Sequence, residues 1–356
     1  MGQYPCLEIN LKKIRENAVR MLDMCHSVGV EPAGVTKVCC GQREVACALV
    51  QAGFTLLADS RLENIEKYAD LPVKKLLLRL PMPSAADETV RLADYSLVSE
   101  QATVRALGEA AARQGRTHGV IVMLEMGDLR EGAPNEQALE ELARCVLREK
   151  SLRLMGVGAN FVCFGGAQPT RENLTHLVGV RDMLSRKLGV EIPWVSGGSS
   201  SCETLIRRGE FPAGVNQLRT GALMHTGIGL NDWVVPGFHT DAYVLKAEII
   251  ELNVKPSMPY GVLGTDAFGR VRSWEDRGDI RRAIVAVGRQ DVEMDVLIPL
   301  DEGVRILGGS SDHMLVELAS PQREYRVGDV MSFAAGYVSV LRSCTSPYVR
   351  KVVVDG

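Results

Sequence analysis

Short apolar runs alternate with amphipathic stretches along the first two thirds of the chain. Stretches whose apolar residues recur at spacings of three and four predict helices, and the β-branched or apolar runs between them predict buried strands. The predicted helices include 43–52, 101–114, 136–148 and 171–187. The predicted strands are 34–37, 55–59, 75–80, 95–98, 119–126, 152–160, 194–197 and 215–220.

Eight strand-and-helix units in this length of chain favour a closed parallel barrel of the (β/α)8, or TIM, type. An open doubly wound sheet is the poorer match, because no GxGxxG phosphate loop follows the first predicted strand. We therefore predict an α/β fold in which residues 1–235 form the barrel domain.

After Trp233 the pattern changes to alternating apolar and polar positions separated by turns rich in Gly and Pro. Such alternation predicts half-buried strands, and no long amphipathic helix is visible in this part of the sequence. We predict a second, all-β domain at residues 236–356, which is a usual domain size. Its predicted strands are 242–254, 283–287, 304–307, 314–317 and 348–354.

The composition narrows the classes of function. The chain is 46% hydrophobic and 24% charged, which excludes a disordered, collagenous or coiled-coil protein. The 41 Lys and Arg residues nearly balance the 44 Asp and Glu residues, and a net charge of -3 does not indicate a nucleic-acid or membrane-surface partner. We expect a small-molecule ligand.

Two further features concern location and metals. No apolar run approaches the roughly 20 residues that a bilayer requires, and the first ten residues do not resemble a signal peptide, so we predict a cytoplasmic protein. The nine cysteines form no CxxC pair. We interpret them as buried, reduced thiols and expect no metal site.

In a parallel barrel, functional groups lie where the strands end at the carboxyl face. Lys37 closes the first predicted strand, in the segment AGVTKVCCG. Two interpretations are open: a lysine at the rim whose amine reaches solvent, and a lysine whose desolvated amine is a nucleophile.

The seventh and eighth predicted strands end in segments suited to an anion. The segment SGGSSS at 196–201 precedes a helical stretch, where backbone N–H groups and hydroxyls can hold a phosphate; a plain Gly/Ser turn with a helix cap is the alternative. Arg219 and Gly221 follow in the eighth strand, where they supply a fixed cation and room for close approach. A lysine with a phosphate cradle opposite it indicates pyridoxal 5'-phosphate, whose aldehyde reacts with amines.

These elements, in this order, resemble the fold-type III pyridoxal-phosphate enzymes of the alanine racemase family. The segments GVTKV, MGDLREG, SGGSSS, LRTGA and VGRQDV carry the resemblance and are most similar to the ornithine racemase branch. The resemblance covers nearly the whole chain. It implies a barrel, a C-terminal β domain and pyridoxal 5'-phosphate as the cofactor.

The resemblance also assigns roles to the matching residues. It implies that Lys37 holds the cofactor aldehyde as a Schiff base and then serves as an acid and base at Cα of the substrate. Arg219 matches an arginine that faces the pyridine nitrogen, and Arg130 matches an arginine near the cofactor hydroxyl and the substrate carboxylate. The other residues expected to bind the cofactor are Asn160, Ser199, Ser200, Gly221, Ala222 and Tyr348.

Departures from the family leave the second base open. Alanine racemase has a catalytic tyrosine where this chain has Arg289, and Asn160 replaces a histidine expected to support that tyrosine. The candidates for the second base are Asp291, His313, Asp312 and Cys40. For each a structural role is the alternative, such as a buried carboxylate paired with Arg289 or a histidine whose hydrogen bonds are satisfied. We expect Arg289 and Asp312 to contact the substrate.

The resemblance therefore implies an amino-acid racemase, in which Lys37 acts on one face of Cα and a group from a neighbouring subunit's β domain acts on the other. Ornithine or a similar basic amino acid is the expected substrate, because carboxylates near the site can pair with its ammonium group. These carboxylates belong to Asp128, Glu131, Asp291 and Asp312. A shared site implies a homodimer. The alternatives are a D-amino-acid aldolase or dehydratase of the same fold, and a non-catalytic carrier of the cofactor.

Overall fold

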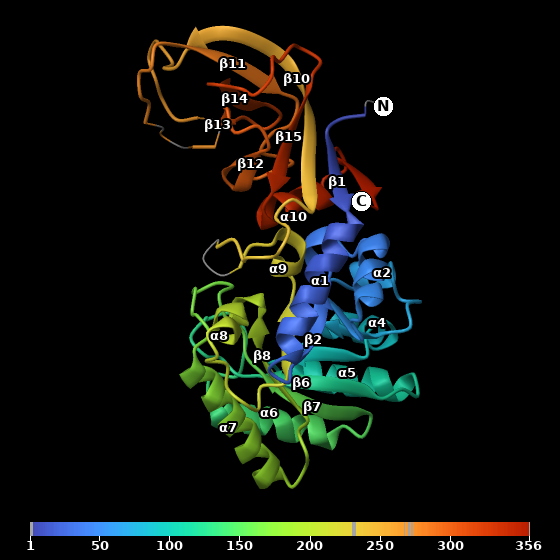
Figure 1. Ribbon diagram of the computed structural model, residues 1–356. Coiled ribbons are helices and arrows are strands. Elements are labelled where there is room, and N and C mark those ends of the chain that lie inside the picture. The colour runs from blue at the N-terminus through green and yellow to red at the C-terminus, as the bar shows by residue number, and fades with distance from the viewer. Residues whose placement is uncertain (1–2, 230–232, 267, 270, 272, 356) are drawn as a thin grey trace. The chain divides into compact units, whose positions relative to one another are not determined.

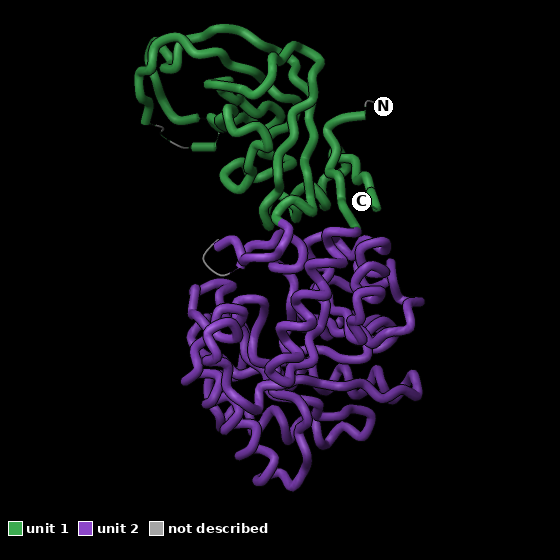
Figure 2. The backbone as a smooth tube through the Cα atoms, in the orientation of Figure 1, with its two compact units in different colours: residues 1–11, 240–356 green, residues 12–239 purple. Residues whose placement is uncertain are grey.

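The computed structural model describes residues 3–229, 233–266, 268–269, 271 and 273–355. The chain forms two compact units, one made of residues 12–239 and the other of residues 1–11 and 240–356 (Figure 2). We had placed the first eleven residues in the barrel domain, but β1 (Cys6–Asn10) pairs with strands of the C-terminal unit. The division after residue 239 lies four residues beyond the predicted boundary.

The first of these units contains the predicted barrel, which is confirmed. Its eight parallel strands close in the order β2-β3-β4-β5-β6-β7-β8-β9. Figure 1 shows this unit and labels β2, β6, β7 and β8 among its helices. The strands are β2 (Glu31–Val35), β3 (Leu56–Asp59), β4 (Lys74–Leu77), β5 (Tyr95–Val98), β6 (His118–Met123), β7 (Leu152–Gly158), β8 (Trp194–Ser199) and β9 (Gln217–Thr220).

Helices connect successive strands, and the four that we predicted are found within one residue of the expected ends. Sequence signals define their ends: Thr170 and Asn173 form a capping box at the start of α7, and Gly189 ends it with a φ of 64°. The helices are α1 (Leu11–His26), α2 (Arg43–Ala52), α3 (Leu62–Glu66), α4 (Ala86–Leu92), α5 (Gln101–Arg113), α6 (Glu136–Arg148), α7 (Arg171–Leu188), α8 (Glu203–Arg207) and α9 (Ala222–Thr226). Short 3-10 turns are η1 (Lys37–Cys39), η2 (Pro83–Ala85) and η3 (Ser200–Cys202).

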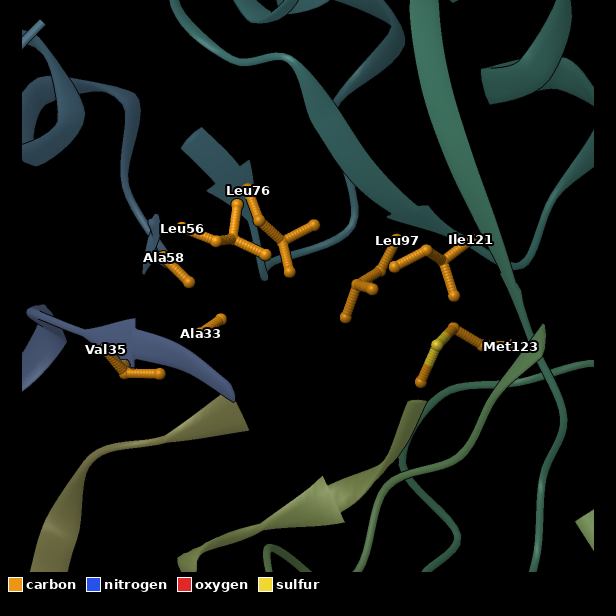
Figure 3. Packing of buried hydrophobic residues seen from close by; sticks show 8 residues of the cluster. All are labelled: Ala33, Val35, Leu56, Ala58, Leu76, Leu97, Ile121 and Met123. Carbon is orange, nitrogen blue, oxygen red and sulfur yellow. The ribbon is translucent and has the colours of Figure 1, made fainter. Parts of the chain in front are cut away.

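Side chains fill the inside of the barrel. Residues two apart on a strand point to the same face, so Ala33 and Val35 of β2 join Leu56 and Ala58 of β3 in one buried cluster (Figure 3). Leu76, Leu97, Ile121 and Met123 complete the cluster. The barrel interior is therefore a packed core, and chemistry is confined to its rim.

The other unit is built on one sheet of eight strands, in which the long β10 pairs with β1, β11 and β15. Its strands are β1, β10 (Tyr243–Pro256), β11 (Asp279–Val285), β12 (Leu297–Pro299), β13 (Val304–Gly309), β14 (Met314–Leu318), β15 (Val330–Ala335) and β16 (Arg350–Val354). The predicted β domain is confirmed, and it also contains one nine-residue helix that was not predicted, α10 (Tyr337–Thr345). Its apolar face is too short to show a helical period in the sequence.

Candidate active site

Closure of the barrel places its first strand beside its last. In the parallel pairing of β2 with β9, Ala33 lies opposite Arg219 and Gly34 opposite Thr220, while β9 also pairs with β8. The carboxyl ends of three adjacent strands therefore carry the lysine and both anion-binding segments. We expected the phosphate cradle to lie across the barrel mouth from the lysine, but it begins on the neighbouring strand.

Lys37 lies just beyond a strand rather than at its end. β2 stops at Val35, because Thr36 takes a φ of -96° and a ψ of 2° and starts the 3-10 turn η1. The Lys37 side chain is half-buried, and Cys40 follows in the left-handed region with a φ of 53°. A strand that ends in a tight turn fixes the backbone at the root of this long side chain.

The SGGSSS segment and Gly221 meet at the rim. Ser199 ends β8, and its hydroxyl oxygen accepts a hydrogen bond from the Ser201 amide at 3.3 Å. Ser200 Oγ accepts a hydrogen bond from the Gly221 amide at 2.9 Å. Ala222 is the first residue of α9, and a Cβ added to Gly221 would lie 3.1 Å from Val35 Cβ. The Ser200–Gly221 hydrogen bond thus joins the two segments that carry the four predicted phosphate residues of the barrel.

Arg219 is a buried cation at the same rim, with only 6% of its surface exposed. Its guanidinium donates to the carbonyl oxygens of Ser196 at 3.3 Å and Ala159 at 2.7 Å, and to the Ser196 hydroxyl. Burial lowers the pKa of Arg219 to about 10, and the charge of Glu131 partly opposes this effect. The side chain therefore remains cationic at neutral pH, held in place by the ends of β7 and β8.

Asn160 is buried and lies in a loop whose side-chain and backbone N–H groups donate hydrogen bonds to the Asp128 carboxylate. Asn160 Nδ2 donates to Asp128 Oδ2 at 3.1 Å, and the amides of Cys163 and Phe164 donate to the same carboxylate at 3.1 and 3.2 Å. Asp128 is 1% exposed. It anchors the loop after β7 and does not present a carboxylate to a substrate.

Arg130 forms an ion pair with its neighbour Glu131 through two guanidinium nitrogens. Burial acts to lower the pKa of Arg130, but the hydrogen bond to Glu131 and the charges of Cys163, Glu131 and Asp128 together outweigh it, and the pKa is raised. The surrounding turn is held by Glu125, whose carboxylate accepts hydrogen bonds from the amides of Gly127 and Leu129 at 2.6 and 3.0 Å. Glu131, like Asp128, therefore already has a partner.

The remaining predicted site residues lie in the unit of 1–11 and 240–356. Arg289 is largely buried there, and it donates to Glu293 at 3.2 Å and to the Gly309 carbonyl at 3.3 Å. Asp291 is 6% exposed, and its Oδ1 accepts a 2.6 Å hydrogen bond from Ser346 Oγ. The alternative pairing of Asp291 with Arg289 is not found, because each has another partner.

Two segments of this unit are joined through their backbones. The amide of Arg289 donates to the Ser310 carbonyl at 2.9 Å and that of Gln290 to the Ser311 carbonyl at 3.1 Å. Asp312 and His313 follow at once and are exposed. Tyr348 is 65% exposed, and its amide donates to Ser346 Oγ at 3.0 Å. Four of the predicted residues of this unit, Arg289, Asp291, Asp312 and His313, therefore lie on neighbouring segments.

Among the described residues no group of three or more His, Cys, Asp or Glu side chains is arranged to hold a metal ion, and no helix there is long and apolar enough to cross a membrane. None of the nine cysteines, all of which lie among the described residues, forms a disulfide. Six are buried, as expected, whereas Cys163 is exposed and Cys40 and Cys47 are half-buried.

Three buried residues next to the turn that carries Lys37 were not predicted from the sequence. Thr36, Asp59 and Tyr68 are fully buried and joined by hydrogen bonds. Asp59 ends β3 and therefore lies at the same end of its strand as Lys37 does of β2. The rule that selected Lys37 would have selected Asp59 as well.

A lysine, an arginine and a hydroxyl-rich turn on adjacent strand ends define a barrel protein of the alanine racemase class. The chain belongs to this family: the model for the alanine racemase N-terminal domain matches residues 9–227. The chain is 38% identical to an ornithine racemase from Acetoanaerobium sticklandii, over 98% of this chain and 99% of that protein. It is 39% identical to a lysine racemase from Thermotoga maritima, over 98% of each.

Solved structures agree on the fold. The chain is similar to the alanine racemase of Clostridium difficile 630, with a TM-score of 0.74 and 18% identity over 100% of this chain and 97% of that one. A D-threonine aldolase from Filomicrobium marinum has a TM-score of 0.71 and 18% identity, over 96% of this chain and 90% of that one. At these identities the structures establish the shared fold alone.

Proposed function

We propose that the protein is an isomerase, a pyridoxal-phosphate-dependent racemase of ornithine or a similar basic amino acid. The observation that carries this proposal is the similarity over nearly the full length to an ornithine racemase and a lysine racemase. The barrel rim supports it, because Lys37 stands beside the turn formed by Ser200 and Gly221.

The residues of the rim fit the cofactor. Gly221 has no side chain where one would press against Val35, so its backbone can lie close to β2 while its amide donates to Ser200 Oγ. We propose that a phosphate binds at this turn, together with Ser199 and Ser200. Arg219, cationic and fixed by two carbonyls, is suited to face the pyridine nitrogen. Ala222, the first residue of α9, is proposed to bind the phosphate through its amide, and Asn160, which donates to Asp128, is proposed to bind the cofactor as well. When bound, the cofactor withdraws electrons from the substrate Cα and makes its proton acidic.

The proton then moves between Cα and two groups of the protein. Lys37 takes or returns it on one face, and the second group acts on the opposite face. We propose that this group comes from the β unit of a second subunit, which makes the active form a homodimer. The candidates are His313 and Asp291. His313 is the better one, because it is exposed whereas the Asp291 carboxylate is buried against Ser346.

The remaining residues bind rather than transfer protons. Arg130 is proposed to hold the substrate carboxylate, and Tyr348 to reach the cofactor phosphate, as the family resemblance implies. Arg289, which we expected to contact the substrate, donates to Glu293 and to the Gly309 carbonyl, so we propose instead that it orients the segment that carries the second base. Asp312 is the carboxylate best suited to the substrate's distal ammonium, because Asp128 is satisfied by amides and Glu131 by Arg130.

Incubation with L-ornithine in heavy water tests the reaction. We expect deuterium at Cα together with the D isomer. Exchange without D-ornithine would exclude racemisation, and uptake of the cofactor without any exchange would favour the carrier alternative. Formation of an aldehyde and a shorter amino acid from a β-hydroxy amino acid would favour the aldolase alternative.

The Lys37→Ala variant tests the assignment of the lysine. It should lose the visible absorbance that the wild type gains with pyridoxal 5'-phosphate, and borohydride should no longer fix the cofactor to the protein. Colour that remains reducible by borohydride would show that another amine holds the cofactor.

A further inference from the structure

The turn that carries Lys37 is tied to a buried carboxylate with no part in the proposed proton transfer. Asp59 ends β3 and has 0% exposed surface. Its Oδ1 accepts hydrogen bonds from Asn64 Nδ2 at 2.9 Å and from the Arg61 amide at 3.1 Å, and its Oδ2 accepts one from Thr36 Oγ1 at 2.7 Å. Burial raises the pKa of Asp59, and these hydrogen bonds act in the opposite direction.

The hydrogen bonds at Thr36 have only one consistent direction. Thr36 has a single hydroxyl hydrogen, and the 2.7 Å contact with Asp59 is far shorter than the 3.4 Å contact with the Ala58 carbonyl. The hydrogen therefore points to Asp59. Tyr68 OH, 3.0 Å from the same hydroxyl oxygen, must then be the donor to it. The result is a chain of hydrogen bonds from Tyr68 through Thr36 to Asp59, wholly enclosed in the protein.

The backbone of Thr36 also forms hydrogen bonds that hold the turn. Its carbonyl accepts hydrogen bonds from the amides of Cys39 at 3.2 Å and Gly41 at 3.1 Å. Its amide donates to the Ala58 carbonyl at 2.9 Å. Both sides of its peptide unit and its side chain are therefore fixed one residue before Lys37.

The end of the turn, at Cys40 and Gly41, is also held by residues of the segment 59–68. A Cβ added to Gly41 would lie 2.6 Å from Asn64 Cβ, so the backbone there packs directly against the residue that binds Asp59. Lys67 Nζ donates to the Cys40 carbonyl at 2.6 Å. The turn is therefore held at both ends by the segment 59–68, in which Asp59 accepts the hydrogen bonds of Thr36 and Asn64.

We propose that Asp59 is a positioning residue for Lys37: through Thr36 it fixes the turn so that the lysine amine meets the cofactor aldehyde. This inference rests on the proposed function. The amine attacks the aldehyde carbon, a C=N bond forms and one water molecule leaves. A four-carbon side chain reaches its target reproducibly only if its root is fixed, and a displacement of about 1 Å costs roughly a hundredfold in rate.

The test separates attachment to Lys37 from binding at the phosphate turn. Thr36→Val removes the connection with little change of shape, Asp59→Asn replaces the carboxylate acceptor by a neutral amide of the same shape, and Thr36→Ser retains the hydroxyl. We expect the first two to slow covalent attachment of pyridoxal 5'-phosphate about tenfold or more, followed by absorbance and by borohydride trapping. Affinity for pyridoxine 5'-phosphate, which has no aldehyde, should stay within about twofold of wild type. Thr36→Ser should restore the attachment rate.

The matched control is Ser96→Ala, which removes another fully buried hydroxyl, 2.8 Å from His118 Nε2 and remote in the sequence from Lys37. It should lower the melting temperature without slowing attachment. Should a variant fail to fold, Tyr68→Phe removes one donor from the chain and should slow attachment less. Attachment at the wild-type rate in Thr36→Val or Asp59→Asn overturns the proposal, as does a parallel loss of affinity for pyridoxine 5'-phosphate. A wild type that takes up no cofactor refutes the proposed function itself.

Discussion

The hydroxyl oxygen of Ser200 accepts a 2.9 Å hydrogen bond from the amide of Gly221, and this contact joins the ends of β8 and β9 at the rim. Since β9 also pairs with β2, the same contact brings the turn next to the root of Lys37. The cofactor site that we propose therefore spans three neighbouring strands, with its phosphate end at Ser200.

Gly221 should be sensitive to the addition of one methyl group. In Gly221→Ala the new Cβ would lie 3.1 Å from Val35 Cβ, on a strand that cannot move freely. We expect unfolding in urea to become easier by about 1 kcal/mol and pyridoxal 5'-phosphate to bind about tenfold more weakly. Absorbance titration and urea unfolding measure the two effects.

Gly179→Ala provides the matched control. Gly179 lies within α7, and a Cβ there has no atom within 4 Å. Alanine is the better helix former, so this variant should be more stable by about 0.5–1 kcal/mol and bind the cofactor like wild type. Equal behaviour of the two variants would show that the space at Gly221 is not needed.

The barrel could be predicted from the sequence because its buried strands and amphipathic helices differ in period. What the sequence could not show was which strand ends are neighbours in space. Lys37 and Gly221 are far apart along the chain, and only closure of the barrel puts them side by side.

The sequence also could not show which neighbouring groups bind the carboxylates near the site. Asp128 and Glu131 looked like acceptors for a substrate ammonium, because a carboxylate after a barrel strand is a candidate site residue. In the fold, the Asp128 carboxylate accepts hydrogen bonds from two backbone amides and from Asn160, and Glu131 forms an ion pair with Arg130. Helix α10 was not predicted because its nine residues are too few to show a helical period in the sequence.

Asp128→Asn should weaken the structure and not substrate recognition. The amide group that replaces one carboxylate oxygen would face the N–H groups of Cys163 and Phe164, which leaves buried donors unsatisfied. We expect a loss of about 1–3 kcal/mol in urea unfolding, with little change in KM for ornithine. Asp182→Asn, at a side chain that is 56% exposed, should change stability by less than about 0.5 kcal/mol. A raised KM at unchanged stability would instead place Asp128 on the substrate.

His313 and Asp291 should differ in their effect on exchange. Loss of one base stops racemisation in both directions but leaves the other base able to exchange one enantiomer with solvent. For His313→Gln we expect deuterium uptake to slow about a hundredfold or more for one isomer of ornithine and far less for the other. Asp291→Asn should slow both isomers alike, because the carboxylate is engaged by Ser346. Equal slowing in His313→Gln would remove it as the second base.

The buried His118 should make stability depend on pH. Its ring nitrogens lie 2.8 Å from Ser96 Oγ and 3.2 Å from the Ala93 carbonyl oxygen, and burial lowers the pKa of His118 to about 4 from 6.5. In the unfolded chain His118 therefore binds a proton below about pH 6.5, whereas in the folded chain it binds one only below about pH 4. Stability that is fully present above pH 6.5 is lost progressively as the pH falls between these values, by about 2 kcal/mol at about pH 5.

Urea unfolding at about pH 7.5 and about pH 5 measures this loss. His118→Gln keeps a polar side chain but removes the titrating ring, so the difference in unfolding free energy between the two pH values should shrink by about 2 kcal/mol. His176→Gln removes a histidine whose side chain is 54% exposed, and it should reproduce the wild-type difference. If His118→Gln and His176→Gln respond alike to acid, the proton that destabilises the protein binds elsewhere.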